Sequence, residues 1–204
     1  MKPVVPLPSE ELVRAACKEY EGDVADLALN ELFTQYPSNK SYSHVLLKVV
    51  TLNRLYSTSI YAVYDAATHI HERAEEIDSA LAAGSPEIVD TIAALTLGAT
   101  GKKRHVYSFA SKYCSWHKQD KYPIWDSRVR RYLSALRRQL KNTDDARLLG
   151  TNPDLWTLYP EFVELITGLR RRYRLAAFSF KDIDKFLWKH GRDPKDDAAS
   201  MTTA

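Results

Sequence analysis

Apolar residues recur every three or four positions along most of this chain. That spacing places them on one face of an α-helix. The pattern indicates about eight to ten helices, and no segment alternates apolar and polar residues over the length of a strand. The sequence therefore predicts an all-α fold. We expect a single helical domain over 9–191, an extended arm over 1–8 and a disordered tail over 192–204.

The expected helices begin at residues that favour helix N-termini. Ser9, Asp23 and Ser179 each precede a periodic apolar segment, where a side-chain oxygen can accept hydrogen bonds from the first turn. Two further helices are expected over 58–84 and 87–97, and each is closed by a glycine.

The segment over 41–57 is the most apolar of the expected helices. Its apolar residues, among them Val45, Leu46, Val49 and Val50, cover more than one face of the helix. A surface helix buries one face only, so we expect this helix to lie at the centre of the core.

The composition fits a globular protein outside the membrane. Hydrophobic residues make up 45% of the chain, which is enough for a core, whereas the longest uncharged apolar runs are too short to span a bilayer. The first residues do not have the pattern of a signal peptide. Cys17 and Cys114 suit a reducing compartment, and no Cys/His spacing is typical of a metal site. We expect a cytoplasmic protein, favour a monomer, and predict no metal and no cofactor.

Positive charge is concentrated in one segment, 102–142. This segment holds twelve Lys and Arg against two acids, whereas the whole chain has 29 against 26. Such clustering is typical of a face that binds a polyanion, and two solvated helix faces are the simpler alternative. The candidate contacts to DNA phosphates are Lys102, Lys103, Arg104, Arg128, Arg130 and Arg131.

The first three of these cations lie in the sequence GATGKKRH, a glycine-flanked turn ahead of a predicted helix. Exposed backbone N–H groups at such a turn can bind an anion. A plain interhelical loop with solvated lysines fits the pattern equally well.

One of the two acids of the basic segment, Asp126, stands in the sequence YPIWDSRVRRYL. Pro123 fixes the entry into the turn, and Asp126 precedes the next helix by one residue. Its side chain can cap that helix while a carboxylate oxygen stays exposed at the end of a basic groove. An aspartate that only caps the helix is the commoner interpretation.

A glycine-rich turn, a helix, a loop and then Pro-x-x-Asp ahead of a helix with Val and Arg resembles the helix-hairpin-helix superfamily of base-excision DNA glycosylases. The similarity covers about residues 40–142. In that family a hairpin grips the DNA backbone, and an aspartate beyond the following helix is the catalytic carboxylate. The resemblance implies a hairpin at 98–103, the following helix at 108–117, and Asp126 as the catalytic acid.

Bifunctional members of that family place a lysine nucleophile at the start of the helix after the hairpin. That register falls here on Tyr107 or Ser108, and Lys112 is the lysine within the helix. Lys112 is therefore a candidate catalytic residue. It is equally a groove lysine that contacts phosphate or pairs with Asp126. Its displaced register favours a monofunctional glycosylase over a glycosylase/lyase.

The resemblance also implies a pocket for a flipped base between the helix over 108–117 and the helix over 41–57. The candidates for its walls are Asn53, Tyr56, Trp116, His117 and Trp125. Aromatic faces stack an extruded base, but aromatic side chains also fill cores. We expect half or more of the aromatic residues in this region to belong to the core.

These observations lead to two hypotheses about function. The first is a DNA N-glycosylase that rotates a damaged or modified base out of double-stranded DNA and stabilises the sugar cation with Asp126. The second is a non-catalytic nucleic-acid-binding or partner-binding helical module with a glycosylase-like fold. The sequence does not name the base, and it is compatible with genome repair and with phage defence.

Overall fold

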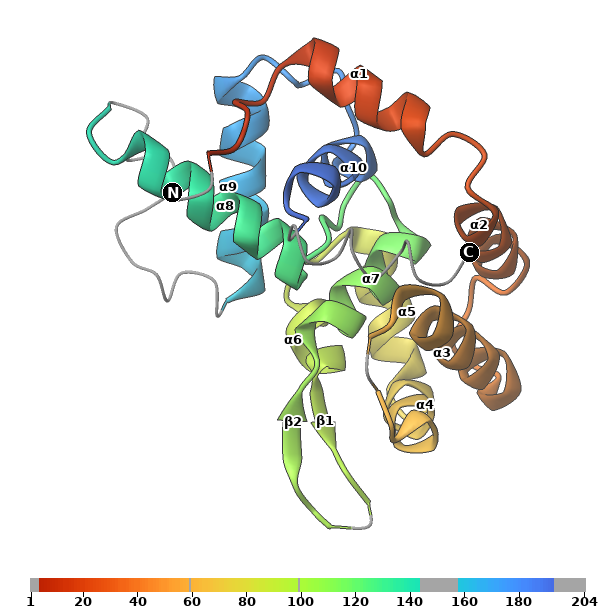
Figure 1. Ribbon diagram of the computed structural model, residues 1–204. Coiled ribbons are helices and arrows are strands. Elements are labelled where there is room, and N and C mark those ends of the chain that lie inside the picture. The colour runs from red at the N-terminus through yellow and green to blue at the C-terminus, as the bar shows by residue number, and fades with distance from the viewer. Residues whose placement is uncertain (1–3, 59, 99, 144–157, 193–204) are drawn as a thin grey trace, which may run out of the picture.

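The computed structural model describes residues 4–58, 60–98, 100–143 and 158–192 (Figure 1). Ten helices and two short strands lie within these residues, so the predicted all-α fold is confirmed. The elements are α1 (Glu10–Glu19), α2 (Val24–Gln35), α3 (Tyr42–Tyr56), α4 (Val63–His71), α5 (Ala74–Ala83), α6 (Ile88–Ala93), β1 (Ala94–Thr96), β2 (Lys103–His105), α7 (Tyr107–His117), α8 (Ser127–Leu140), α9 (Tyr159–Arg172) and α10 (Phe180–His190).

Helix α7 lies at the centre of the fold, and eight consecutive residues of it, 109–116, are buried. It packs against α2, α3 and α6, while α10 packs between α1 and α8 (Figure 1). A helix buried on all sides must pair its polar side chains inside the protein, because an unpaired polar group loses its hydrogen bonds to water. The polar residues of α7 therefore determine which other segments approach it.

The prediction that the helix over 41–57 lies at the centre is wrong. Helix α3 buries one face, which includes Val45 and Leu52. Leu47, Val50 and Leu55 are 42% to 46% exposed on the other side. Apolar composition therefore did not identify the central helix, because α7 obtains its burial from small and aromatic residues that are mixed with polar ones.

The predicted capping residues are confirmed. Ser9 and Ser179 accept hydrogen bonds from the backbone N–H three residues further on, at 3.3 Å and 3.1 Å. Asp23 accepts from two backbone N–H groups of the first turn of α2, at 2.9 Å and 3.1 Å. Gly84 ends α5 with a φ of 75°, in the left-handed region that favours glycine.

Two predicted helix boundaries are corrected by the structure. The helix expected over 58–84 is divided into α4 and α5. The helix expected over 87–97 ends at Ala93, because the chain continues into β1, which pairs antiparallel with β2. The side chains of β1 alternate, with Leu95 buried and its neighbours exposed. This alternation over three residues is too short to distinguish from the helical pattern in the sequence.

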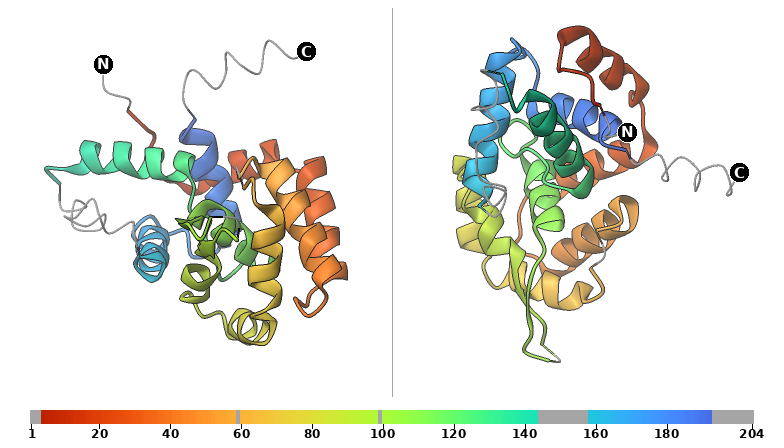
Figure 2. Two further views of the ribbon diagram at one scale, coloured as in Figure 1. Left: turned by 90° about the horizontal axis from the view of Figure 1, so that it is seen from below. Right: turned by 60° about the vertical axis from the view of Figure 1, so that its left-hand side comes forward.

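The segment expected to form an interhelical turn at 98–103 is the end of this β-hairpin. Gly101 adopts a φ of 65°, and its N–H donates to the Leu97 carbonyl at 2.7 Å. Figure 1 and the right-hand view of Figure 2 show the hairpin projecting from the helical body. The chain therefore has a helix, a β-hairpin and a helix where the sequence suggested a helix, a turn and a helix.

The described part of the arm, residues 4–8, is extended and packs on α8. Val5 is buried, and its N–H donates to Gln139 Oε1 at 3.3 Å. The hydroxyl of Tyr132 donates to the Pro6 carbonyl at 2.8 Å. Apart from Arg192, the tail predicted to be disordered lies outside the described residues.

Helices α8 and α10 meet at a tight joint. A Cβ added to Gly191 would overlap the carbonyl oxygens of Arg128 and Leu187, so only glycine fits there. Arg131 Nη1 donates to the Gly191 carbonyl at 2.8 Å. The Arg128 guanidinium lies 3.8 Å from the centre of the Trp188 ring. This joint holds the start of α8 against α10.

Among the described helices, none combines the length and the apolar character that crossing a bilayer requires.

Candidate functional site

A pocket of about 390 Å³ lies where α2, α3, α7, α8 and α10 meet. Its walls include Tyr56, Lys112, Asp126, Arg128, Lys181 and Asp184. Volumes of about 300–1,000 Å³ are typical of small-molecule sites. The pocket contains both catalytic candidates from the sequence.

The position of Asp126 is fixed by the residue before it. The Ser111 hydroxyl, on the buried helix α7, accepts from the Trp125 N–H at 3.0 Å and donates to the Trp125 carbonyl at 3.3 Å. The Trp125 ring stacks on Tyr107 and packs against Phe162. These contacts hold the backbone that leads into α8, so the side chain of Asp126 is directed by the rigid core.

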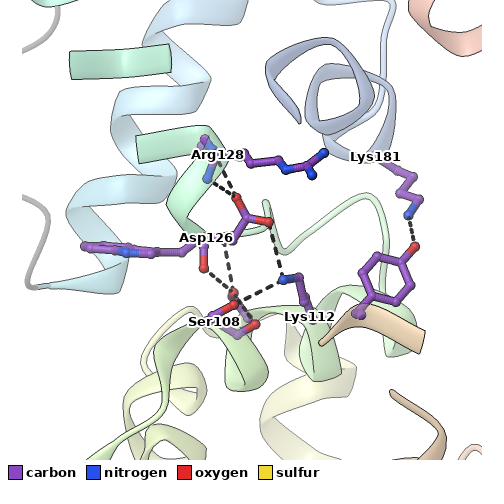
Figure 3. Close-up of polar contacts among 9 residues, drawn as sticks. Ser108, Lys112, Asp126, Arg128 and Lys181 are labelled. Carbon is purple, nitrogen blue, oxygen red and sulfur yellow. Dashed lines mark hydrogen bonds and ion pairs between the residues drawn. The ribbon is translucent and has the colours of Figure 1, made fainter. Parts of the chain in front are cut away.

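The two oxygens of the Asp126 carboxylate have different roles. Oδ1 caps α8 by accepting from the N–H groups of Arg128 and Val129, both at 3.0 Å. Oδ2 lies 3.3 Å from Lys112 Nζ (Figure 3). Asp126 is therefore both the predicted helix cap and a wall of the pocket.

Lys112 reaches Asp126 from α7. Its Nζ donates to Ser108 Oγ at 3.1 Å, one helical turn earlier (Figure 3). It also lies 5.7 Å from the centre of the Tyr56 ring. Lys112 and Asp126 are buried, and such a pair is held only where each charge finds partners. Besides each other, Lys112 contacts Ser108 and Tyr56, and Asp126 accepts from two backbone N–H groups.

A second ionic cluster forms the opposite wall of the pocket. Lys181 Nζ lies 3.3 Å from Asp26 Oδ2 and 3.3 Å from the Tyr56 hydroxyl. The Tyr56 hydroxyl donates to Asp26 Oδ1. Burial raises the pKa of Tyr56, and the Asp26 carboxylate raises it further. Tyr56 therefore stays a neutral hydrogen-bond donor on this wall.

Asp184 lines the same pocket from α10 and lacks such partners. It is 8% exposed, and its Oδ1 is buried with no hydrogen-bond partner among the described residues. Burial raises the pKa of the Asp184 carboxyl to about 7. Lys181 and Lys112 oppose this rise, whereas Asp126 and Asp26 add to it. Asp126 and Asp184, two of the four acids that line the pocket, thus lie in different environments.

The predicted base-pocket residues are only partly brought together. Tyr56 lines the pocket. Trp116 does not line the pocket but packs against a residue that does, since Lys181 Nζ lies 4.4 Å from the centre of its ring. Trp125 packs in the core beside the pocket, as described above. Asn53 and His117 do not line the pocket, so the prediction is wrong for these two residues.

Asn53 and His117 both have local structural partners. Asn53 closes the turn after α3, because its Nδ2 donates to the Ile60 carbonyl and its Oδ1 accepts from the Ile60 N–H and Thr58 hydroxyl. His117 Nε2 lies 3.2 Å from Lys48 Nζ. Burial lowers the pKa of His117 well below its usual value, and the Lys48 charge lowers it further. A neutral His117 accepts from Lys48 in the core rather than facing a ligand.

The predicted phosphate-binding cations separate into two groups. Lys102, Lys103 and Arg104 are exposed on the projecting β-hairpin (Figure 1). Arg130 is exposed on α8. Arg128 and Arg131 are half-buried and take part in the joint between α8 and α10. The basic segment is thus divided between two separate elements.

Three charged residues of the pocket, Asp26, Lys181 and Asp184, come from outside the basic segment and were not identified from the sequence. A signal existed for Asp184. In α10, Phe180, Ile183 and Leu187 form one apolar face, and Asp184 stands at a position of that same face. An acid on the buried face of an amphipathic helix is a candidate for function.

Within the described residues, no cluster of three or more His, Cys, Asp or Glu side chains could hold a metal ion.

Comparison with known proteins places the chain in a family. Residues 10–121, more than half of the chain, match the HI_0787_N model, which is described as an N-terminal domain. The chain belongs to this family. An uncharacterized protein of Haemophilus influenzae is 30% identical over 176 residues, which cover 85% of this chain and 80% of that protein. No solved structure matches. The HI_0787_N match includes α7 with Lys112 and stops before Asp126.

Proposed function

We propose that this protein is a DNA N-glycosylase that receives a flipped base in the pocket between α7 and α10. The observation that carries the proposal is the Asp126 carboxylate, which faces a cavity of about 390 Å³ and is held by both a helix N-terminus and Lys112. The aromatic side chain of Tyr56 also lines this cavity, and aromatic rings can stack on an extruded base.

The proposed chemistry follows from the charge of the sugar. Breaking the bond between C1′ and the base nitrogen builds positive charge on the sugar ring. A carboxylate beside that ring stabilises the cation and orients the attacking water. Asp126 needs little reorganisation for this role, because its backbone is fixed by Ser111 and its Oδ1 by two N–H groups.

Lys112 acts in this scheme on Asp126 rather than on the sugar. A lysine that forms an imine with C1′ must attack as the neutral amine. Lys112 Nζ is instead engaged with Asp126 Oδ2 at 3.3 Å and with Ser108 Oγ at 3.1 Å, and these contacts direct it toward the carboxylate. The proposed enzyme is therefore monofunctional.

The DNA duplex is held in this proposal by exposed cations outside the pocket. Lys102, Lys103 and Arg104 extend from the helical body on the β-hairpin, and Arg130 projects from α8. Contacts of this kind bind phosphates without regard to base sequence. Base selection is then left to the pocket.

The direct test incubates the protein with duplexes that each carry one damaged or modified base. Base release is measured by strand cleavage in alkali, and a parallel reaction with borohydride traps any imine. The proposal predicts alkali-dependent cleavage of at least one duplex and no trapped adduct. A trapped adduct that disappears in Lys112→Arg would contradict the monofunctional mechanism.

A non-catalytic nucleic-acid-binding or partner-binding module is the second candidate. It is favoured by the fact that every contact of Asp126 also has a structural purpose, since Oδ1 caps α8 and Oδ2 pairs with a buried lysine. Under this alternative the protein binds duplexes but releases no base from any of them.

A further inference from the structure

We infer that Asp184 is a second functional acid of the pocket, which donates a proton to the leaving base and favours a base with an acceptor ring nitrogen, such as a purine. This inference rests on the proposed glycosylase function and assigns the group that acts on the base, as Asp126 acts on the sugar. It depends on where Asp184 lies and on what its side chain lacks.

Asp184 and Asp126 line the same cavity, Asp184 from α10 and Asp126 from the start of α8. Its Oδ1 is buried and has no hydrogen-bond partner among the described residues. A buried carboxylate without a partner is unfavourable, whereas a carboxylic acid is tolerated in the same place. Because the Asp184 side chain lines the pocket, we assign its acidic proton to a bound base.

The charges around Asp184 come from four elements. Lys181 lies on α10, Lys112 on α7, Asp126 at the start of α8 and Asp26 on α2. Both lysines are already paired, Lys112 with Asp126 and Lys181 with Asp26. Each positive charge near Asp184 thus has a negative partner of its own. Burial therefore has the largest effect on the protonation of Asp184, which agrees with its pKa of about 7.

Asp126 and Asp184 thus have different environments. Asp126 accepts from two backbone N–H groups and pairs with Lys112, whereas Asp184 Oδ1 is buried without a hydrogen-bond partner among the described residues. Enzymes assign the roles of acid and base by this kind of difference between two carboxyl groups.

The proposed step balances protons and electrons. The C1′–N9 bond of a purine nucleotide breaks, and its electron pair stays with the base. Asp184 gives its proton to the N3 or N7 nitrogen of that base, which leaves as the neutral purine, and Asp184 becomes a carboxylate. Water adds to C1′ and passes a proton to Asp126. Solvent then restores both acids to their initial states.

A purine fits this scheme better than uracil or thymine, and cytosine keeps one such acceptor, N3, where a purine keeps two. Adenine and guanine both keep two ring nitrogens, N3 and N7, as acceptors away from the glycosidic bond. Uracil and thymine have no such acceptor nitrogen in their rings. A carboxylic acid in the pocket therefore favours a base that can accept its proton on a ring nitrogen.

The test compares two kinds of purine with the variant Asp184→Asn. One duplex series carries neutral damaged or modified purines, and a second carries N7-methylguanine, whose base is already positively charged and needs no proton. Excision of the neutral purine should fall by about a hundredfold or more in the variant, the usual scale for loss of a general acid. Excision of N7-methylguanine, corrected for spontaneous loss, should change only a few fold.

The pH profile gives a second readout. Wild-type excision of the neutral purine should decline as the pH rises through about 7, and the profile of the variant should be flat there. The matched control is Asp120→Asn, an exposed acid outside the pocket. It should keep the wild-type rates on both substrates. Binding of the variant to a duplex with a stable abasic-site analogue should equal that of the wild type.

Each remaining outcome separates the two proposals. Equal losses on both purines, or no loss on either, would overturn the role of Asp184 while leaving the glycosylase proposal intact. Excision restricted to uracil, thymine and their derivatives would do the same. A wild-type protein that releases no base from any duplex would overturn the glycosylase proposal, and the role of Asp184 with it.

Discussion

The Nζ of Lys112 and the Oδ2 of Asp126 lie 3.3 Å apart, with the two side chains only 6% and 7% exposed. One comes from the central helix and the other from the residue that caps α8. A buried ion pair of this kind is costly to break, because removal of one partner leaves the other charge buried and uncompensated. The pair therefore links the stability of the fold to the geometry of the pocket.

The first prediction is that the two residues are energetically coupled. Lys112→Met and Asp126→Asn should each lower the free energy of unfolding, with a loss of about 3–5 kcal/mol when one charge is left unpaired. The double variant should lose less than the sum of the single losses by at least about 1 kcal/mol. Urea denaturation of the four proteins measures this difference. Strictly additive losses would show that the ion pair makes no net contribution.

The second prediction concerns the β-hairpin. Changing Lys102, Lys103 and Arg104 together to Glu should weaken binding to any duplex sequence and lower the slope of log K against log salt by about 3, near 0.9 for each lost phosphate contact. The melting temperature should hardly change, because all three side chains are exposed. Filter binding at several salt concentrations measures the slope.

The matched control for the hairpin reverses three exposed cations outside the basic segment, Lys18, Lys40 and Arg54. If this control weakens binding as much as the hairpin variant does, the effect comes from net charge and the hairpin is not a DNA contact. Arg128 and Arg131 are unsuitable for such a test, because their contacts with Trp188 and Gly191 support the fold.

The third prediction concerns the joint between α8 and α10. Gly191→Ala should lower the free energy of unfolding by about 1–3 kcal/mol, because the added methyl group meets the carbonyl oxygens of Arg128 and Leu187. Gly98→Ala is the control, since a Cβ there meets only the flexible side chain of Asp65. Thermal unfolding of both variants checks the prediction. Equal stability of the two would mean that the joint opens easily.

The fourth prediction uses the pKa of about 7 that burial gives Asp184. Between about pH 4, the pKa of an aspartate in the unfolded chain, and about pH 7, the folded protein binds a proton on Asp184 that the unfolded chain has released. The free energy of unfolding contributed by this proton is therefore fully present below pH 4 and is lost as the pH rises through 7. Asp184→Asn removes this loss. The variant should therefore gain stability relative to the wild type between pH 4 and pH 8. Denaturant titrations at both pH values measure the difference, and a constant difference would contradict the assignment.

The sequence predicted the fold class and the capping residues because both depend on local patterns. The spacing of apolar residues defines most helices, and Ser9, Asp23 and Ser179 act within one turn of the chain. Asp126 was found for the same reason, as an acid directly before a helix. The sequence left open whether Lys112 is a nucleophile, contacts phosphate or pairs with Asp126, and in the structure its Nζ lies 3.3 Å from Asp126 Oδ2.

The remaining parts of the site depend on contacts between distant segments. Asp26 and Lys181 meet across more than 150 positions of the chain, and neither stands in a local motif. Asn53 satisfies its amide within the turn that follows α3, which a helical pattern does not predict. The β-hairpin was missed because Leu95 alone marks its alternation.

The most direct test of the central claim is the excision rate of Asp126→Asn on a duplex that the wild type accepts. Single-turnover base release should fall by about a hundredfold or more, because the carboxylate that faces the sugar cation is lost. Duplex binding should persist, and circular dichroism should confirm that the variant is folded at the assay temperature. Asp120→Asn should keep the wild-type rate. Base release by Asp126→Asn at the wild-type rate would show that Asp126 only caps α8 and pairs with Lys112, and would contradict the proposed mechanism.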